Sequence, residues 1–311
     1  TGGGCPHILA EPQRTNLVKY SESINSWTTG FSSLSPNAVT ADYAQGPYSN
    51  TNADRVQLTI NPSNAVSQIT QFLPITSGLY TASVWLKSLS GTPTISIIDG
   101  YNTVGSFKLV TLTNQWVRHI LTFTASGSDF IPQFLLLNGT TSSSADFLVY
   151  GFQVELGSYP TSYIPTSTST VTRNQDLFTR DGIASLINST AGVFFIEMAT
   201  FLDEGTTADK WIALSDGTAN NSVRIAYSGG ANTIRAYLNV GGSAQADMTY
   251  AVTNVTQFSK IAFSYAANNF NLWVDGVKRV TDTSGSVFSA NTLNRLGLDN
   301  GGGLYTQRSW L

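Results

Sequence analysis

GFQVELGSYPTSYIP, residues 151–165, is the stretch that decides how this chain folds. Residues 147–156 are nearly all apolar, as expected for a strand covered on both faces. Pro160 and Pro165 then remove backbone donors and hold the chain extended. The Ser and Thr run at 166–170 has nothing to bury, so the new pattern beyond it belongs to a second core. The stretch therefore predicts two domains joined by a linker.

This boundary divides the chain into four segments. We expect an N-terminal lead-in at 1–16, a first domain at 17–158, a linker at 159–173 and a second domain at 174–311. A length of 311 residues suits this division, since domains typically hold roughly 100–200 residues each. A hydrophobic content of 41% is enough to fill two cores.

The composition excludes several classes of function. Charged residues make up 11% of the chain, against roughly 25% in an average soluble domain. The net charge of -3 argues against nucleic-acid binding, which needs clustered Lys and Arg. No apolar run approaches the length of a membrane span. Cys5 is the only cysteine, so no internal disulfide forms, which fits folding in a reducing cytoplasm followed by action outside the cell.

The first domain reads as short strands separated by turn residues, which is typical of an all-β sandwich. About eight runs predict a jelly roll. The expected strands are 55–60, 66–72, 79–87, 94–99, 107–112, 116–124, 130–138 and 147–156.

The second domain also reads as strands, after one brief helix candidate at 183–187. Its clearest signal is FNLWVDGV at 270–277, where Asp-Gly stands between two alternating segments as a two-residue hairpin turn. The expected strands are 192–198, 211–215, 223–227, 233–240, 244–248, 258–265, 270–274, 277–281, 293–298 and 304–311.

Several motifs carry a resemblance to a known family. EPQRTNL at 11–17 is followed by YSE at 20–22 and SWT at 26–28, and VELGSYPTSYIPTSTSTVTR occupies 154–173. Together they resemble tail-fibre and other virion proteins of tailed phages and prophages. In these proteins a jelly roll similar to carbohydrate-binding module families 4 and 9 precedes a laminin-G-like, concanavalin A-like domain. FNLWVDGV resembles the hairpin of the second type.

The resemblance implies a non-catalytic, lectin-like adhesive module that binds host surface glycan for host attachment. It implies further virion proteins as partners, a homo-oligomer, commonly a trimer, and a place in the virion or outside the cell. Two alternatives stay open. One is a purely structural capsid or tail component, and the other is an accessory binding region of a secreted polysaccharide-degrading enzyme.

Trp85 is the first candidate for stacking on a sugar ring. In 80–87 it shares a face with Thr81, Ser83 and Lys87, opposite an apolar set, and such an aromatic can pack on sugar C–H groups. Trp27 is a second candidate aromatic. The alternative is that Trp85 packs beneath the opening segment around Trp27.

Loop tyrosines supply the other candidates. Tyr43 and Tyr48 lie in the turn-rich segment 42–50, and Tyr101 follows Asp99 and Gly100. Aromatic side chains beside Asn, Gln and Asp can form a glycan-binding rim. Surface tyrosines are also common in polar loops without such a role.

Calcium is the only cofactor that the resemblance implies, because family 4 and 9 modules usually hold a structural ion near the chain ends. Glu11, Asp146 and Glu155 supply hard oxygen ligands in suitable regions, although no compact calcium motif is present.

We expect no enzymatic activity. Glycoside hydrolysis would need two carboxylates about 5–10 Å apart. In the second domain Glu197 stands alone in an apolar strand, so the sequence offers no such pair there.

Overall fold

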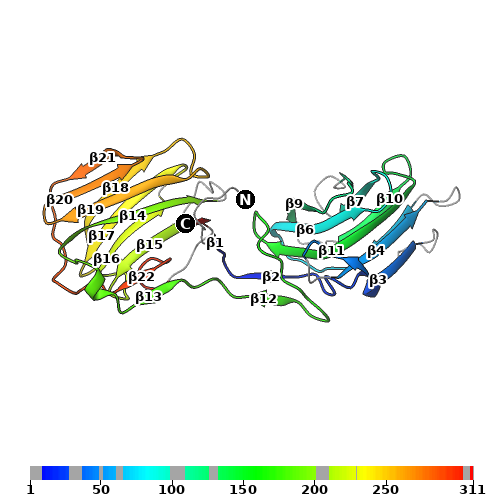
Figure 1. Ribbon diagram of the computed structural model, residues 1–311, viewed down its shortest axis with the longest axis horizontal. Helices are drawn as coiled ribbons and strands as arrows, with labels where there is room; N and C mark the ends of the chain where they lie inside the picture. The colour runs from blue at the N-terminus through cyan, green and yellow to red at the C-terminus, as the bar shows by residue number, and fades with distance from the viewer. Residues whose placement is uncertain are drawn as a thin grey trace. The chain divides into compact units, whose positions relative to one another are not determined.

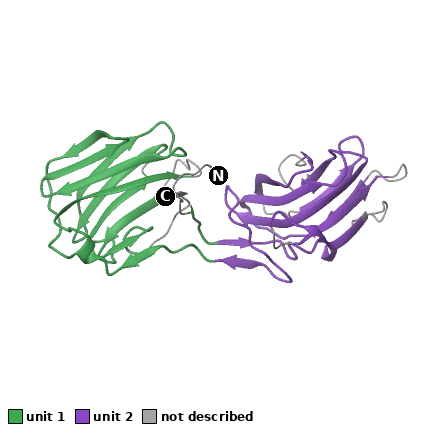
Figure 2. Ribbon diagram, in the orientation of Figure 1, with its two compact units in different colours: residues 1–13, 174–311 green, residues 14–173 purple. Residues whose placement is uncertain are grey.

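The structure, a computed structural model, describes residues 9–27, 37–48, 52–60, 66–98, 109–125, 132–200, 210–228, 230–303 and 309–310. Within these residues the chain forms β-strands and two short 3-10 turns, η1 at Ile24–Ser26 and η2 at Ala184–Leu186. The chain divides into two compact units, with residues 14–173 in unit 2 and residues 1–13 and 174–311 in unit 1 (Figure 2). No helix in the described part of the chain is long and apolar enough to cross a membrane.

Unit 2 is a jelly-roll sandwich of two antiparallel sheets, in which successive strands mostly alternate between the sheets (Figure 1). The larger sheet has the order β3 (Asn37–Gln45), β4 (Asn52–Thr59), β11 (Ser144–Leu156), β6 (Gly78–Ser88) and β9 (Val117–Ala125). The smaller sheet has the order β5 (Val66–Thr70), β10 (Pro132–Leu137), β7 (Thr94–Ile98) and β8 (Leu109–Thr111). The expected all-β class and jelly roll are confirmed.

The core of unit 2 is built around stacked aromatic rings. Trp27 packs between Phe134 and Phe152, with ring centroids 5.8 Å and 5.4 Å away. Its indole Nε1 donates to the Tyr20 carbonyl over 3.1 Å, so this polar atom is satisfied inside the core. Trp27 is only 5% exposed. As a sugar-stacking candidate it is therefore wrong, because no ring face is open to a ligand.

Residues 159–173, expected to be a linker, belong to unit 2. We call 159–170 the strap. It carries the buried residues Thr161, Ile164 and Thr166, and it ends at β12 (Val171–Arg173), which pairs with β2 (Arg14–Asn16). Thr161 and Thr166 are buried with hydrogen-bond partners, whereas Ser162 and residues 167–170 are exposed as the composition predicts.

Asn16 joins the strap to the sheet. Its Nδ2 donates to the carbonyls of Phe152 and Ile164 over 3.2 Å and 2.9 Å. Its Oδ1 accepts from the backbone N–H groups of Val18 and Val154, each over 3.1 Å. One fully buried side chain of the lead-in thus satisfies backbone groups of Val18, β11 and the strap.

Unit 1 is a sandwich of two antiparallel sheets. One sheet has the order β1 (Leu9–Ala10), β23 (Ser309–Trp310), β14 (Ala191–Thr200), β19 (Ser259–Ala266), β20 (Asn269–Val274) and β21 (Val277–Asp282). The other has the order β13 (Thr179–Asp181), β22 (Arg295–Gly297), β15 (Lys210–Ser215), β16 (Ser222–Tyr227), β17 (Thr233–Val240) and β18 (Ser243–Ala251).

Local signals in unit 1 behave as the sequence predicts. Asp275 and Gly276 have φ values of 50° and 78° and connect β20 to β21, as a two-residue turn of positive φ does. The helix candidate at 183–187 is the single turn η2. Since β1 pairs with β23, unit 2 is an insertion after the first strand of unit 1.

We predict that Asn16→Ala lowers the free energy of unfolding of unit 2 by about 3 kcal/mol, because buried backbone groups lose their partners. Urea unfolding of the full chain measures the change. The matched control is Thr15→Ala, which removes the exposed Thr15–Thr172 hydroxyl pair and should cost no more than about 0.5 kcal/mol. Equal losses in the two variants would contradict the role given to Asn16.

Candidate functional site

The face of the larger unit 2 sheet that points away from the core carries the site. Along β6, Val84 and Leu86 enter the core, whereas Trp85 points to the opposite side. Trp85 pairs with Tyr150 on β11 and Arg118 on β9. The strand alternation in the sequence predicts this orientation correctly. Trp85 does not pack beneath Trp27, which lies in the core.

Four aromatic side chains form the aromatic face, which we define as Tyr48, Trp85, Tyr150 and Tyr163. Tyr48 meets Trp85 and Tyr150 edge to face, with centroids 5.9 Å and 6.1 Å away. Tyr150 in turn lies 5.3 Å from Tyr163. Tyr48 is 47% exposed, so it is the member that solvent or a ligand reaches most readily. The indole Nε1 of Trp85 is buried and has no hydrogen-bond partner among the described residues.

The strap places Tyr163 on this face. A bulge in β11 puts Gly151 at a φ of 66°, and a Cβ there would lie 3.0 Å from the Tyr163 ring. A side chain at position 151 would therefore be strained and would also displace the ring. Tyr163 forms a 2.6 Å hydrogen bond with the Ser21 hydroxyl.

Tyr150 and Tyr163 are neutral phenols at physiological pH. Burial is the largest cause that raises the pKa of each, and both also hydrogen-bond to Glu22. Their hydroxyl groups position the rings and are not poised to lose a proton.

Arginine side chains stand on both sides of the aromatic face. Arg55 donates to both oxygens of Asp146, over 2.8 Å and 2.5 Å, and its guanidinium lies 4.8 Å from the Tyr43 ring centroid. Arg118 donates to the Ser83 hydroxyl over 2.9 Å and to the Thr161 carbonyl over 2.8 Å. Such fixed polar groups beside aromatic rings can orient a polar ligand.

The structure brings Trp85 and Tyr48, two of the predicted aromatic residues, into contact, whereas Tyr43 contacts Arg55. Tyr43 is 48% exposed and lies in β3, so the segment 42–50 is in part a strand with a register shift and not a loop throughout. Tyr101 lies outside the described residues.

The three candidate calcium ligands do not converge. Glu11 belongs to unit 1, whereas Asp146 and Glu155 lie in unit 2. These two are nine positions apart on β11, which separates them by about 30 Å along an extended strand. No group of three or more His, Cys, Asp or Glu suited to a metal occurs among the residues that the structure describes. The proposed set therefore does not fit a calcium ion.

Glu155 anchors the strap instead. It is fully buried and accepts hydrogen bonds from the backbone N–H of Thr161, from its hydroxyl over 2.7 Å and from Gln153 Nε2 over 3.0 Å. Gln153 Oε1 accepts from the Ile164 N–H over 2.8 Å. Burial raises the pKa of Glu155, while Thr161, Arg14 and Arg118 act in the opposite direction.

Sequence reasoning missed Tyr150, Tyr163 and Arg118. Tyr150 lies inside a run that reads as buried on both faces, and Tyr163 lies in the expected linker. Arg118 lies directly opposite Trp85 on the neighbouring strand β9. Its position in the alternating pattern of β9 was the signal that could have placed it on the outer face.

Unit 1 carries another arginine-rich aromatic layer, on the outer face of β15–β18. Arg235 lies 5.6 Å and 4.9 Å from the ring centroids of Trp211 and Tyr237, and Arg224 lies at 5.6 Å and 5.3 Å. Arg235 also donates to both oxygens of Asp247, over 2.7 Å and 2.8 Å. Trp211 is only 7% exposed. Stacking within this layer covers its rings, so the layer stabilises the sheet and presents little aromatic surface.

Similarity to known proteins is found among solved structures. No protein-family model matches the sequence, and no curated protein matches it. Among solved structures, sheep galectin-11 in complex with glycerol aligns at a TM-score of 0.29 and 10% identity, covering 39% of this chain and 88% of that chain. Mouse laminin α1 domains LG4-5 align at a TM-score of 0.26 and 12% identity, covering 84% and 85%. At these scores neither likeness bears on function.

We predict that Glu155 makes unit 2 less stable as the pH rises. Because burial raises its folded-state pKa above the ordinary value of 4.5, the stability it contributes is complete below that ordinary value, which the unfolded chain keeps. That contribution is lost as the pH rises through the folded pKa. Glu155→Gln carries no charge, so its free energy of unfolding should rise relative to the parent chain between pH 4 and pH 7.

Urea unfolding across this pH range measures the difference between the two proteins. Thr161→Val is the companion variant, since it removes the hydroxyl that donates to the carboxylate and should cost more stability at pH 7 than at pH 4. A difference between Glu155→Gln and the parent chain that is constant with pH would contradict the prediction.

Proposed function

We propose that this protein is a non-catalytic carbohydrate-binding module that holds saccharide on the aromatic face of unit 2. The observation that carries the proposal is the half-exposed Tyr48 ring packed against Trp85, on a sheet face that points away from the core. Sugar rings present C–H groups that pack on aromatic surfaces, and hydroxyl groups that need polar partners. Both kinds of contact are available on this face.

The residues divide this work between them. Tyr48 supplies the accessible ring surface. Trp85 lies beneath it and holds an indole N–H that a ligand hydroxyl would satisfy if Tyr48 moved aside. Arg55 and Arg118, already oriented by Asp146 and Ser83, flank the rings as donors. The two arginines are held before the ligand arrives, which lowers the entropy cost of binding.

We further propose that the module belongs to a tail fibre or another exposed virion protein of a tailed phage. The motifs at 11–28 and 154–173 support this, together with the order of the two sandwich types along the chain. In this role the chain folds in the host cytoplasm, acts outside the cell and contacts host surface glycan and other virion proteins. A homo-oligomer, such as a trimer, would turn weak single sites into tight attachment, because each later binding event is intramolecular.

We predict that Tyr48→Ala weakens glycan binding about tenfold, which corresponds to about 1.4 kcal/mol of lost stacking. Trp85→Phe keeps a ring but removes the indole N–H, and should also weaken binding. The measurement is a glycan array, run with calcium and with chelator, followed by titration of the best glycan. Thermal melting should be unchanged in Tyr48→Ala, since this side chain is half exposed.

The matched control is Phe72→Ala, which removes an aromatic side chain of unit 2 that is 56% exposed and lies outside the aromatic face. It should bind as the parent chain does. If a folded multimer binds nothing on a broad array, the proposal fails and a purely structural virion component becomes the better interpretation. Release of reducing ends or unsaturated products from a polysaccharide would instead identify an enzyme.

A further inference from the structure

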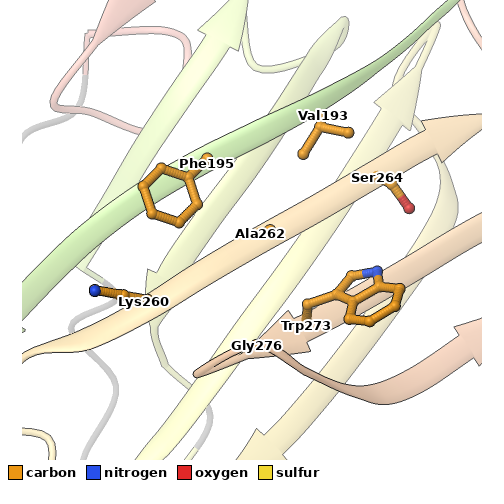
Figure 3. Close-up of a pocket in the computed structure, with 7 residues that line it drawn as sticks. All are labelled: Val193, Phe195, Lys260, Ala262, Ser264, Trp273 and Gly276. Carbon is orange, nitrogen blue, oxygen red and sulfur yellow. The ribbon is translucent and has the colours of Figure 1, made fainter.

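The outer face of β14, β19 and β20 in unit 1 has an exposed apolar hollow (Figure 3). Phe195, Ala262 and Trp273 lie in one row across the three strands. Phe195 is 58% exposed and Trp273 is 38% exposed. Ala262, between them, is too small to fill the gap. Two aromatic walls therefore stand on an alanine floor, and we call this hollow the groove.

The dimensions of the groove suit a single ring. Its volume is about 520 Å³, within the roughly 300–1,000 Å³ of small-molecule sites. Phe195 and Trp273 are two strand spacings apart, about 10 Å. A ring placed midway would lie about 5 Å from each aromatic, inside the stacking range of about 4.5–7 Å.

Two lysines and two carboxylates stand near the groove, and one carboxylate, Asp275, accepts a hydrogen bond from the Lys260 backbone N–H over 2.9 Å. Lys260 and Ser264 line it on either side of Ala262 along β19. The Lys260 ammonium makes no ion pair or hydrogen bond within the described part of the chain, although Glu197 lies opposite it in the register. Lys278 on β21 lies opposite Trp273, on the side of the indole away from Ala262. Its ammonium is 5.8 Å from the centroid of the Trp273 ring. A carboxylate beside a bound ring would find an available cation.

A second copy of the chain is a poorer occupant than a small ligand. Across the sheet, the exposed face from β14 to β21 is about 14 Å wide. Along β14, from Val193 to Glu197, it is also about 14 Å long. A face of this size is far below the roughly 800 Å² per partner of a stable protein interface. It matches the footprint of one or two sugar rings.

We propose that the groove binds a pyranose ring that carries a carboxylate, such as a hexuronic acid residue of an acidic polysaccharide. The ring stacks between Phe195 and Trp273 over Ala262, its carboxylate pairs with Lys260, and a hydroxyl meets Ser264. The class of ligand rests on the proposed saccharide-binding function, but none of these residues belongs to the aromatic face of unit 2. The chain then has two separate sites with different chemistry.

The test is calorimetric titration of the full chain with a tetrasaccharide of alternating glucuronic acid and N-acetylglucosamine, and with a trigalacturonate. The neutral tetramer of N-acetylglucosamine is the control probe. We expect the acidic probes to bind, more weakly as salt is raised. Lys260→Gln should weaken them about tenfold, since it removes a charge-assisted contact, and Phe195→Ala should weaken them by a similar factor.

Ala262→Phe fills the floor of the groove and should abolish binding. Because that variant adds volume on a sheet face, Phe195→Ala provides an independent readout on a side chain that is already largely exposed. Leu186→Ala, at an apolar residue of unit 1 that is 81% exposed and does not line the groove, is the matched control and should bind normally.

Tyr48→Ala separates this proposal from the function proposed for unit 2. Acidic probes that still bind Tyr48→Ala but not Ala262→Phe support the groove, whatever the glycan array shows for unit 2. Binding that Tyr48→Ala removes and the groove variants retain would overturn it. So would silence of both acidic probes, or a concentration-dependent doubling of mass by light scattering that Phe195→Ala prevents, since that would identify a second copy as the occupant.

Discussion

The hydrogen bonds of the buried Asn16 amide are the constraint on which unit 2 depends. They join the lead-in, β11 and the strap at one point. The ladder of β2 with β12 then fixes the two ends of the unit beside each other. Adjacent ends are the usual requirement for inserting one domain into another. This accounts for an insertion after β1, with the remaining strands of unit 1 following the strap.

The same strap builds the aromatic face. Glu155 and Gln153 hold Thr161 and Ile164 by hydrogen bonds. Tyr163 lies between these two residues of the strap, and its ring therefore packs on Gly151 in the β11 bulge. Arg118 reaches the Thr161 carbonyl from the opposite edge. The rings under Tyr48 are therefore fixed by a polar network inside the unit. A loss of order in the strap would affect the stability of the sheet and the geometry of the face together.

Sequence periodicity was sufficient for the features that depend on neighbours along the chain. The alternation of β6 located Trp85 on the outer face, and Asp275-Gly276 located a hairpin. The predictions that were wrong concern contacts between residues far apart in the sequence. Trp27 lies in a polar segment that reads as exposed, yet Asp54 accepts from the Ile24 N–H over 2.7 Å at the start of η1 and thereby turns the indole into the core. Thr166 lies in a run of Ser and Thr that reads as solvated, yet it is buried because its partner Ser21 lies 145 positions earlier in the chain.

The two outer faces of unit 1 show why aromatic content alone does not define a binding surface. On β15–β18 each ring lies near two guanidinium groups, and one of these also pairs with Asp247, so binding a ligand would break contacts that already exist. On β14–β20 the rings stand apart with alanine between them, and the ammonium beside them has no ion pair to break within the described residues. A ligand there gains apolar contact and a charge partner without displacing either. The difference between the faces lies in whether the protein already satisfies its own side chains, and this favours the β14–β20 face as the second surface for recognition.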